Sequence, residues 1–254
     1  MNSLEIYKLL PKKNCGECVS KTCMSFALFL KTNPEAIDQC RYVEPANLGK
    51  LQSTLVQSDW RDELIGSLRR EISGLDLEEI AKDIGGNIRD KRIIIRCIGV
   101  DYAMEKDGTI VPDGGNKWIT ILLLNYIRNM GKGDFTGKWI SFSELKGGFV
   151  KAASFIRECE EPLRELMDGN SEGVVAALEG LKARPVAGYP ADHAWSIDLL
   201  PRVRCLIIYR SADEEFPSSL NILFDGITGQ FIDVESLVFL CEGLVHTLTT
   251  LLKK

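Results

Sequence analysis

Residues 14–40 read NCGECVSKTCMSFALFLKTNPEAIDQC and contain four cysteines, Cys15, Cys18, Cys23 and Cys40, spaced C-x2-C-x4-C-x16-C. Four thiolates this close together indicate a metal centre, because sets of four cysteines hold iron–sulfur clusters or structural zinc. The first three cysteines fit both kinds of site. The fourth has no Cys or His two to four residues away, whereas zinc sites usually consist of two such pairs. The spacing therefore favours a 4Fe–4S cluster over zinc.

The segment between the third and fourth cysteines predicts how the ligands come together. Residues 22–31 form an apolar helical run, and Asn33-Pro34 follows as a turn. One helix then returns the fourth cysteine to the loop that carries the other three. Asn14, Gly16 and Thr22 of that loop are candidates for backbone N–H donors to the cluster's sulfurs. The expected iron ligands are Cys15, Cys18, Cys23 and Cys40.

Residues 4–43 closely resemble the small iron–sulfur domain of the corrinoid iron–sulfur protein large subunit, and the same module in the B subunit of Rnf-type electron-transport complexes. The family pattern LPxxNCGxCGxPTCxxFA…C is matched at Leu10, Pro11, Asn14, Cys15, Gly16, Cys18, Thr22, Cys23, Phe26, Ala27 and Cys40. Val19, Ser20 and Lys21 depart from it without removing a ligand. The resemblance covers about one sixth of the chain. It implies one low-potential 4Fe–4S cluster on the four cysteines.

A second resemblance covers the rest of the chain from about residue 59. It is to domain of unknown function 3786, which is often found behind this cluster module and brings no established activity. The segments that carry it are 139–142 (WISF), 145–148 (LKGG), 213–217 (DEEFP) and 222–225 (ILFD). We therefore expect an iron–sulfur domain at 1–56 and an uncharacterised α+β domain at 57–254.

The larger part mixes helix and strand patterns. Helices are expected at 59–73, 77–84 (with Asp76 as N-cap), 118–130, 149–167, 174–183 and 234–252. Strand signals lie within 92–104, at 109–111 after an Asp107-Gly108 turn, and at 195–198, 203–209 and 220–224. Residues 43–55 are interpreted as a connection, and Asp225-Gly226 and Thr228-Gly229 as turns. The predicted class is α+β, a small helical cluster domain followed by a larger mixed domain.

Composition limits the functional classes. The chain has 254 residues, 45% of them hydrophobic, and a net charge of −5. No apolar run reaches the roughly 18 residues of a membrane span, and no export signal is visible, so we expect a cytoplasmic protein. The acidic balance and the lack of a basic stripe argue against nucleic acid. The remaining cysteines are expected to be buried small hydrophobic residues of a reducing compartment: Cys97, Cys159, Cys205 and Cys241.

Charge is unevenly distributed. Residues 1–56 contain seven Lys or Arg and five Asp or Glu, so this part carries +2 and the remainder −7. Four lysines surround the cluster loop: Lys8, Lys12, Lys13 and Lys21. They offset the negative charge of a cluster with four thiolates and guide an acidic partner, or they are a solvated basic face.

Few other residues suggest catalysis. Of the two histidines, His246 lies in the apolar terminal helix and is expected to be structural. His193 lies in a polar loop beside Asp192 and is a candidate ligand contact. The acidic run 213–215 is either a solvated turn or a site for a cation or basic partner. No nucleotide-binding glycine motif and no nucleophile–base pair is readable.

These observations favour an electron-transfer protein. A cluster with cysteine on every iron has no open site for substrate, so it passes single electrons. The expected recipient is a partner protein, with a corrinoid protein or a ferredoxin as candidates, or a bound cofactor. Reductive activation of a corrinoid protein is implied by the resemblance alone. A corrinoid is expected only on a partner, since the chain lacks a D-x-H-x-x-G motif. The alternatives are a redox enzyme with its active site in the C-terminal domain, and a structural or redox/oxygen-sensing cluster protein. The sequence does not indicate the oligomeric state.

Overall fold

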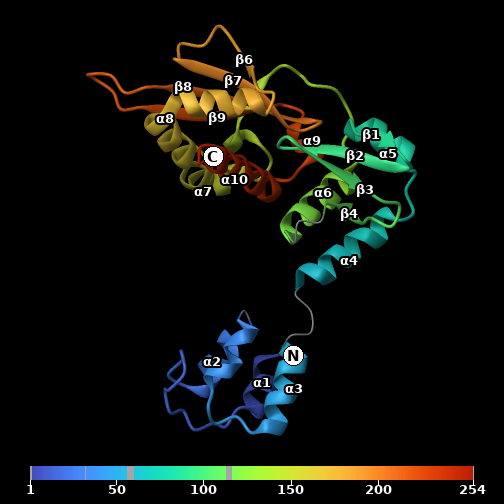
Figure 1. The fold of residues 1–254 in the computed structure, drawn as a ribbon, viewed down its shortest axis with the longest axis vertical. Helices are drawn as coiled ribbons and strands as arrows, with labels where there is room; N and C mark the ends of the chain where they lie inside the picture. The colour runs from blue at the N-terminus through green and yellow to red at the C-terminus, as the bar shows by residue number, and fades with distance from the viewer. Residues whose placement is uncertain (1, 32, 56–59, 113–115, 254) are drawn as a thin grey trace. The chain divides into compact units, whose positions relative to one another are not determined.

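The computed structural model describes residues 2–31, 33–55, 60–112 and 116–253, and these form two compact units, Met1–Leu64 and Ile65–Lys254 (Figure 1). The boundary falls inside helix α4, Trp60–Ile72. The predicted domain boundary after residue 56 and the predicted helix start at residue 59 lie outside the described residues. Each unit is described separately below.

The N-terminal unit is a small helical bundle. It contains α1 (Ser3–Leu9), α2 (Cys23–Phe29), the 3₁₀ helix η1 (Pro34–Gln39) and α3 (Pro45–Leu55). Helix α1 contacts both α2 and α3. The buried side chains that hold these elements together include Ile6, Leu10, Phe26, Ala27, Leu30, Ile37 and Leu51. The unit is helical as predicted. Cys15, Cys18 and Cys40 lie in the segments that connect its helices, and Cys23 is the first residue of α2.

Helix α3 corrects the interpretation of residues 43–55 as a connection. Pro45 occupies the first helical position, where the missing N–H has no intrahelical partner to lose. Leu48, Leu51 and Leu55 then recur at helical spacing and pack into the core, with Leu51 fully buried. Gly49 costs the helix about 1 kcal/mol relative to alanine, which the buried leucines outweigh. The apolar spacing therefore outweighs the residues that suggested a loop.

The C-terminal unit contains two antiparallel sheets. The first has the order β1-β2-β3-β4, with β1 (Asn87–Arg89), β2 (Arg92–Cys97), β3 (Val100–Met104) and β4 (Ile110–Val111). The β-rich stretch 92–104 is thus a hairpin, turning at Ile98 (φ 44°) and Gly99 (φ 80°). The predicted turn before β4 is confirmed, and Thr109 N–H donates to Asp107 there.

Helix α5 (Leu77–Ile84) contacts β1 and β2 of the first sheet, and α6 (Lys117–Asn129) contacts α5. Asp76 is the N-cap of α5, as predicted, and accepts hydrogen bonds from the backbone of Glu78 and Glu79. The central part of α6 is buried on several sides. Its Tyr126 hydroxyl donates to Ile84 O and accepts from Arg202 N–H, which ties α6 to its neighbours.

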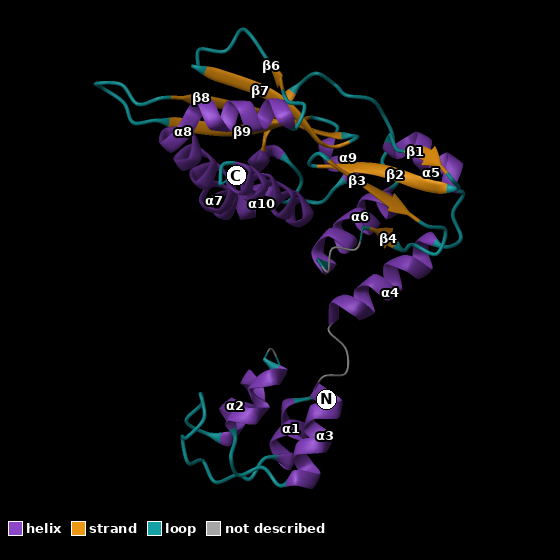
Figure 2. Cartoon of the chain, viewed as in Figure 1, coloured by secondary structure: helices purple, strands orange, loops and turns teal. Residues whose placement is uncertain are grey.

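The second sheet has the order β5-β9-β8-β7-β6. Its strands are β5 (Trp139–Ser141), β9 (Ser219–Asp225), β8 (Val203–Arg210), β7 (His193–Leu200) and β6 (Arg184–Pro185). The three long central strands confirm the predicted ones. The two short edge strands were not predicted. Figure 2 shows α8 and α10 beside this sheet. The fold class is α+β.

The helices beside the second sheet are α7 (Gly148–Phe155), the π-helix η3 (Ile156–Glu160), α8 (Glu161–Gly180), α9 (Thr228–Phe231) and α10 (Val234–Leu251). The helices predicted at 149–167 and 174–183 belong to one run through α7, η3 and α8, bent at Asn170 (φ −159°). Phe142 and Phe155 stack at 4.2 Å between centroids, and both rings meet Phe224 edge-on. This aromatic cluster joins α7 to β9.

Helix α10 bears on the prediction that no segment spans a membrane. Among the described helices it alone has the length and hydropathy to cross one, by composition only. Five of its side chains are buried in the unit: Leu237, Leu240, Cys241, Leu244 and Leu248. The helix contacts α7, η3 and α8. Within this fold α10 is a packed helix of the C-terminal unit.

Of the two turns predicted late in the chain, one is confirmed and one is wrong. Thr228-Gly229 begins helix α9 rather than a turn. Asp225 ends β9 and a turn follows at Gly226 and Ile227, as predicted, but Asp225 is only 1% exposed. It accepts hydrogen bonds from Thr136 and Gly137, so it joins a distant loop to the sheet. The local sequence Asp-Gly indicated the turn but not this long-range role.

Candidate iron–sulfur centre

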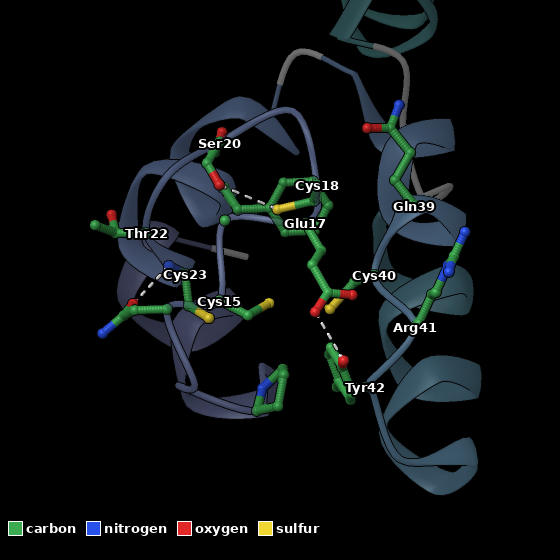
Figure 3. Close-up of a pocket in the computed structure, with 14 residues that line it drawn as sticks. Cys15, Glu17, Cys18, Ser20, Thr22, Cys23, Gln39, Cys40, Arg41 and Tyr42 are labelled. Carbon is green, nitrogen blue, oxygen red and sulfur yellow. Dashed lines mark hydrogen bonds between the residues drawn. The ribbon is translucent and has the colours of Figure 1, made fainter.

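All four cysteines of the N-terminal motif line one pocket (Figure 3). Cys15 and Cys18 lie in the loop between α1 and α2, and Cys23 is the first residue of α2. Cys40 directly follows η1 and reaches the pocket from the opposite segment. The structure therefore brings together the four residues that the sequence predicted as a set.

The first loop takes its shape from left-handed backbone positions. Lys12 (φ 56°), Asn14 (φ 49°) and Gly16 (φ 73°) alternate with ordinary residues, which makes the chain turn tightly beside the first two cysteines. Only glycine adopts such a conformation without cost, and asparagine is the best tolerated alternative. The Asn-Cys-Gly sequence thus supplies both a ligand, Cys15, and the left-handed backbone conformation of the tight turn around it.

Hydrogen bonds hold this loop to α2. The Asn14 side chain accepts from Cys23 N–H at 2.8 Å. Thr22 is the N-cap of α2 and forms a capping box with Ser25. The side chains of Asn14 and Thr22 thus fix the position of Cys23. The role of the Asn14, Gly16 and Thr22 backbone N–H groups as donors to cluster sulfurs stays a prediction.

Three residues outside the cysteine pattern connect the two sides of the pocket. Val19 N–H donates to the Gln39 side chain at 3.3 Å, and the Tyr42 hydroxyl donates to Glu17 at 2.8 Å. Gln39, Glu17 and Tyr42 could not be predicted from the sequence, because they meet only when the chain folds. Together these bonds join the segment carrying Cys40 to the loop carrying Cys18.

The thiols influence one another electrostatically. Burial raises the pKa of the Cys40 thiol, a backbone hydrogen bond from Tyr42 opposes this, and the charges of Cys18, Cys23 and Cys15 raise it further. Gathering four thiolates in one pocket is therefore unfavourable without positive charge. Bound iron supplies that charge and keeps its ligands deprotonated.

The donor set suits a metal centre, because four cysteine thiolates are the ligands of iron–sulfur clusters and of structural zinc. In the part of the chain that the structure describes, no three His, Cys, Asp or Glu side chains are arranged around a single metal ion. The spacing of the four cysteines, with no second pair around Cys40, is the feature that favours the cluster.

Two of the four lysines around the cluster loop have their ammonium groups near aromatic rings. Lys13 Nζ is 4.1 Å from the Tyr42 ring centroid, and Lys12 Nζ is 5.7 Å from that of Tyr7. Lys13 therefore stands over the same tyrosine that closes the pocket through Glu17. This arrangement places positive charge beside the candidate centre.

His193 begins β7, far along the chain from the cysteines. Its ring stacks with that of Tyr209 at 6.3 Å between centroids. The neighbouring Asp192 accepts from the backbone and hydroxyl of Ser211. The acidic run is also engaged locally, since Asp213 accepts from the N–H groups of Glu215 and Phe216. These contacts of Asp192 and Asp213 stabilise the loops in which they lie and do not involve the His193 ring.

The other four cysteines are buried, as predicted. Burial raises the pKa of the Cys97 thiol to about 12. Cys159 and Cys241 share a hydrogen bond, and Cys205 lies close enough to influence Cys241. Burial, followed by this bond, raises the pKa of Cys241 well above its ordinary value. Their sequence positions are scattered, but η3, α10 and β8 bring three of them together.

Two family models match the chain. The family "Putative Fe-S cluster" matches residues 10–42, which contain all four cysteines of the pocket. The family "Domain of unknown function (DUF3786)" matches residues 76–247. No solved structure matches the chain significantly.

Curated relatives match the N-terminal part. The corrinoid/iron-sulfur protein large subunit of Moorella thermoacetica is 52% identical over 46 residues, covering 18% of this chain and 10% of the relative. The acetyl-CoA decarbonylase/synthase complex subunit gamma of Methanopyrus kandleri is 36% identical over 73 residues, covering 29% of this chain and 16% of the relative. The chain thus matches only a small fraction of the length of these proteins.

The segment matched by the iron–sulfur family contains the four cysteines and identifies the kind of cofactor, while most of the chain corresponds to the second family. Since that family's match covers more than half of the sequence, the chain is an iron–sulfur protein that belongs to the DUF3786 family, described as a domain of unknown function.

Proposed function

We propose that this chain is an electron-transfer protein whose single 4Fe–4S cluster is bound by Cys15, Cys18, Cys23 and Cys40. The observation that carries the proposal is the convergence of these four thiols on one pocket. A cluster with cysteine on every iron supplies one-electron transfer and leaves no iron open to substrate. The chain's own residues bind the cluster, fix the loop through Asn14 and place Lys13 at its edge.

A partner protein is the proposed electron recipient. The matched relatives are subunits whose names refer to a corrinoid/iron-sulfur protein and to an acetyl-CoA decarbonylase/synthase complex. By analogy, a corrinoid protein that needs reduction is the most concrete recipient, and a ferredoxin is a candidate partner. We propose a cytoplasmic location, because the four cysteines outside the motif are buried and form no disulfide, as is usual in a reducing compartment.

Anaerobic reconstitution tests the proposal. We expect a brown protein with about four iron and four sulfide per chain, which becomes EPR-active on reduction with dithionite. Cys40→Ala should lose most of this iron. Cys97→Ala is the matched control, since Cys97 is buried in the other unit, and it should keep the full iron content.

Two results would contradict the proposal. A colourless protein with one zinc per chain would exclude a redox role for the motif. A reconstituted cluster that dithionite cannot reduce would leave the cluster assignment intact but remove electron transfer. Reduction of a corrinoid protein is then measured separately, by following the absorbance change from Co(II) to Co(I) with the reduced chain as donor.

A further inference from the structure

A cleft runs along α10 in the C-terminal unit. Its first lobe, of about 580 Å³, lies between α6 and α10. Its second lobe, of about 360 Å³, reaches β2 and β3. Phe239 and Glu242 line both lobes, so the two hollows adjoin. The first lobe alone has the size of a small-molecule site.

An aromatic corner forms one wall of the first lobe. The rings of Trp118 and Phe239 lie 5.8 Å apart between centroids and are tilted by 38°. Trp118 is 40% exposed, so part of this large apolar side chain is open to solvent. Ile121, Leu122 and Val238 continue the apolar lining. The corner therefore offers a face on which an apolar or aromatic body can pack.

Among the described residues that line the first lobe, every charged one is acidic: Glu158, Asp233, Glu235 and Glu242. Two of them have local cations, since Glu158 pairs with Arg157 at 2.5 Å and Glu235 with Lys151 at 2.7 Å. Asp233 is occupied as the N-cap of α10. Glu242 has no ion pair among the described residues.

Glu242 is the polar group at the junction of the two lobes. Burial raises its pKa, and the charge of Glu158 adds to the effect, so the ionised form lacks compensation. It lies three residues after Phe239, on the same side of α10. A positive group beside Glu242 would therefore sit within one helical turn of the aromatic corner.

We propose that this cleft binds an organic cation with an apolar or aromatic body. The body packs on Trp118 and Phe239, and the ammonium group lies against Glu242. The charge of the lining selects a cation over a neutral or anionic ligand of the same shape, and the indole face adds a cation–π contribution. This site is separate from the proposed cluster function and lies within the family domain of unknown function.

Titration calorimetry on the full chain tests the inference with three matched probes: phenethylamine, 2-phenylethanol and phenylacetate. They share an aromatic body and differ in charge. We expect the dissociation constant of phenethylamine to be lower than that of either other probe by about tenfold or more. Benzyltrimethylammonium should bind as well, because it keeps the charge without an N–H donor.

Glu242→Gln keeps the shape of the side chain and removes its charge, so it should weaken phenethylamine binding about tenfold. Glu172→Gln is the matched control, because Glu172 is exposed on α8 and outside the cleft. It should leave the affinity unchanged. Glu158→Gln gives a second reading if the first variant folds poorly, as judged by circular dichroism.

Three outcomes would overturn the proposal. The neutral probe could bind as tightly as the amine, neither cation could bind at millimolar concentration, or Glu242→Gln could retain full affinity. Sedimentation tests the competing occupant. If the chain forms a dimer that Trp118→Ser dissociates, and the dimer binds no amine, the cleft is an interface between copies.

Discussion

The carboxylate of Asp225 receives four hydrogen bonds from the chain around it. They come from the Thr136 N–H and hydroxyl, both at 2.9 Å, from Gly137 N–H at 2.8 Å and from Ile227 N–H at 3.0 Å. Burial alone would raise the pKa of Asp225, but these donors lower it below its ordinary value. A buried charge is stable here because donors surround it.

Asp225→Asn should destabilise the C-terminal unit by about 3 kcal/mol, because an amide replaces a charged acceptor and turns its NH₂ toward donors. Since the folded-state pKa is lowered, the contribution of the charge is present above about pH 4 and is lost as the pH falls through the lowered pKa. Urea denaturation at neutral and acidic pH measures both effects.

Asp107→Asn is the matched control. Asp107 also accepts a backbone N–H, from Thr109, but it lies in an exposed turn. We expect a small change there. An equal loss of stability in the two variants would show that burial adds nothing to the role of Asp225.

At the scale of elements, a close backbone contact fixes where α7 begins. Gly147 is its N-cap, with φ +84°, and Gly148 is its first residue. A Cβ on Gly148 would lie 1.9 Å from Phe142 O. The two glycines of the LKGG segment thus serve different purposes, one a left-handed turn and the other space for a neighbouring carbonyl.

Gly148→Ala should therefore lower the free energy of unfolding by about 2 kcal/mol or more, because a backbone atom cannot yield as a side chain does. Gly169→Ala, in α8, is the control, since nothing lies within 4 Å of its Cβ position. It should be neutral or slightly stabilising. Equal stability of both variants in urea denaturation would contradict this account of the contact.

Elements with a long periodic pattern could be predicted from the sequence. The central strands β7, β8 and β9 and the helices α5, α6 and α10 are examples. The edge strands β5 and β6 could not, because two or three residues carry no period and pair only with a neighbour already in place. Gln39 and Tyr42 could not be predicted for a similar reason, because their partners are brought to them only by the fold. The cysteine spacing indicated a site, but its cross-links are formed by tertiary contacts.

At the scale of the whole molecule, the two units differ in what maintains them. The N-terminal unit has a small core for its 64 residues and contains the four cysteines of the pocket. A unit of this size commonly depends on a bound metal for part of its stability. The C-terminal unit has two sheets and a much larger buried interior.

Removing iron with a chelator under anaerobic conditions should therefore unfold or loosen the first unit and leave the second folded. Trp118, Trp139 and Trp195 lie in the second unit, whereas Trp60 belongs to the first. In a Trp60→Phe variant the fluorescence therefore reports the second unit alone, and it should keep its native unfolding transition. Hydrogen exchange measures the loss of protection in α1–α3. Collapse of both units together would instead favour a structural role for the cluster.

The short edge strands of the second sheet have a consequence for assembly. β5 has three residues and β6 has two, one of which is Pro185, which lacks an N–H. Neither edge strand therefore offers an incoming strand a long row of free backbone groups. A partner at this edge of the second sheet must then recognise side chains rather than add a strand to β5 or β6.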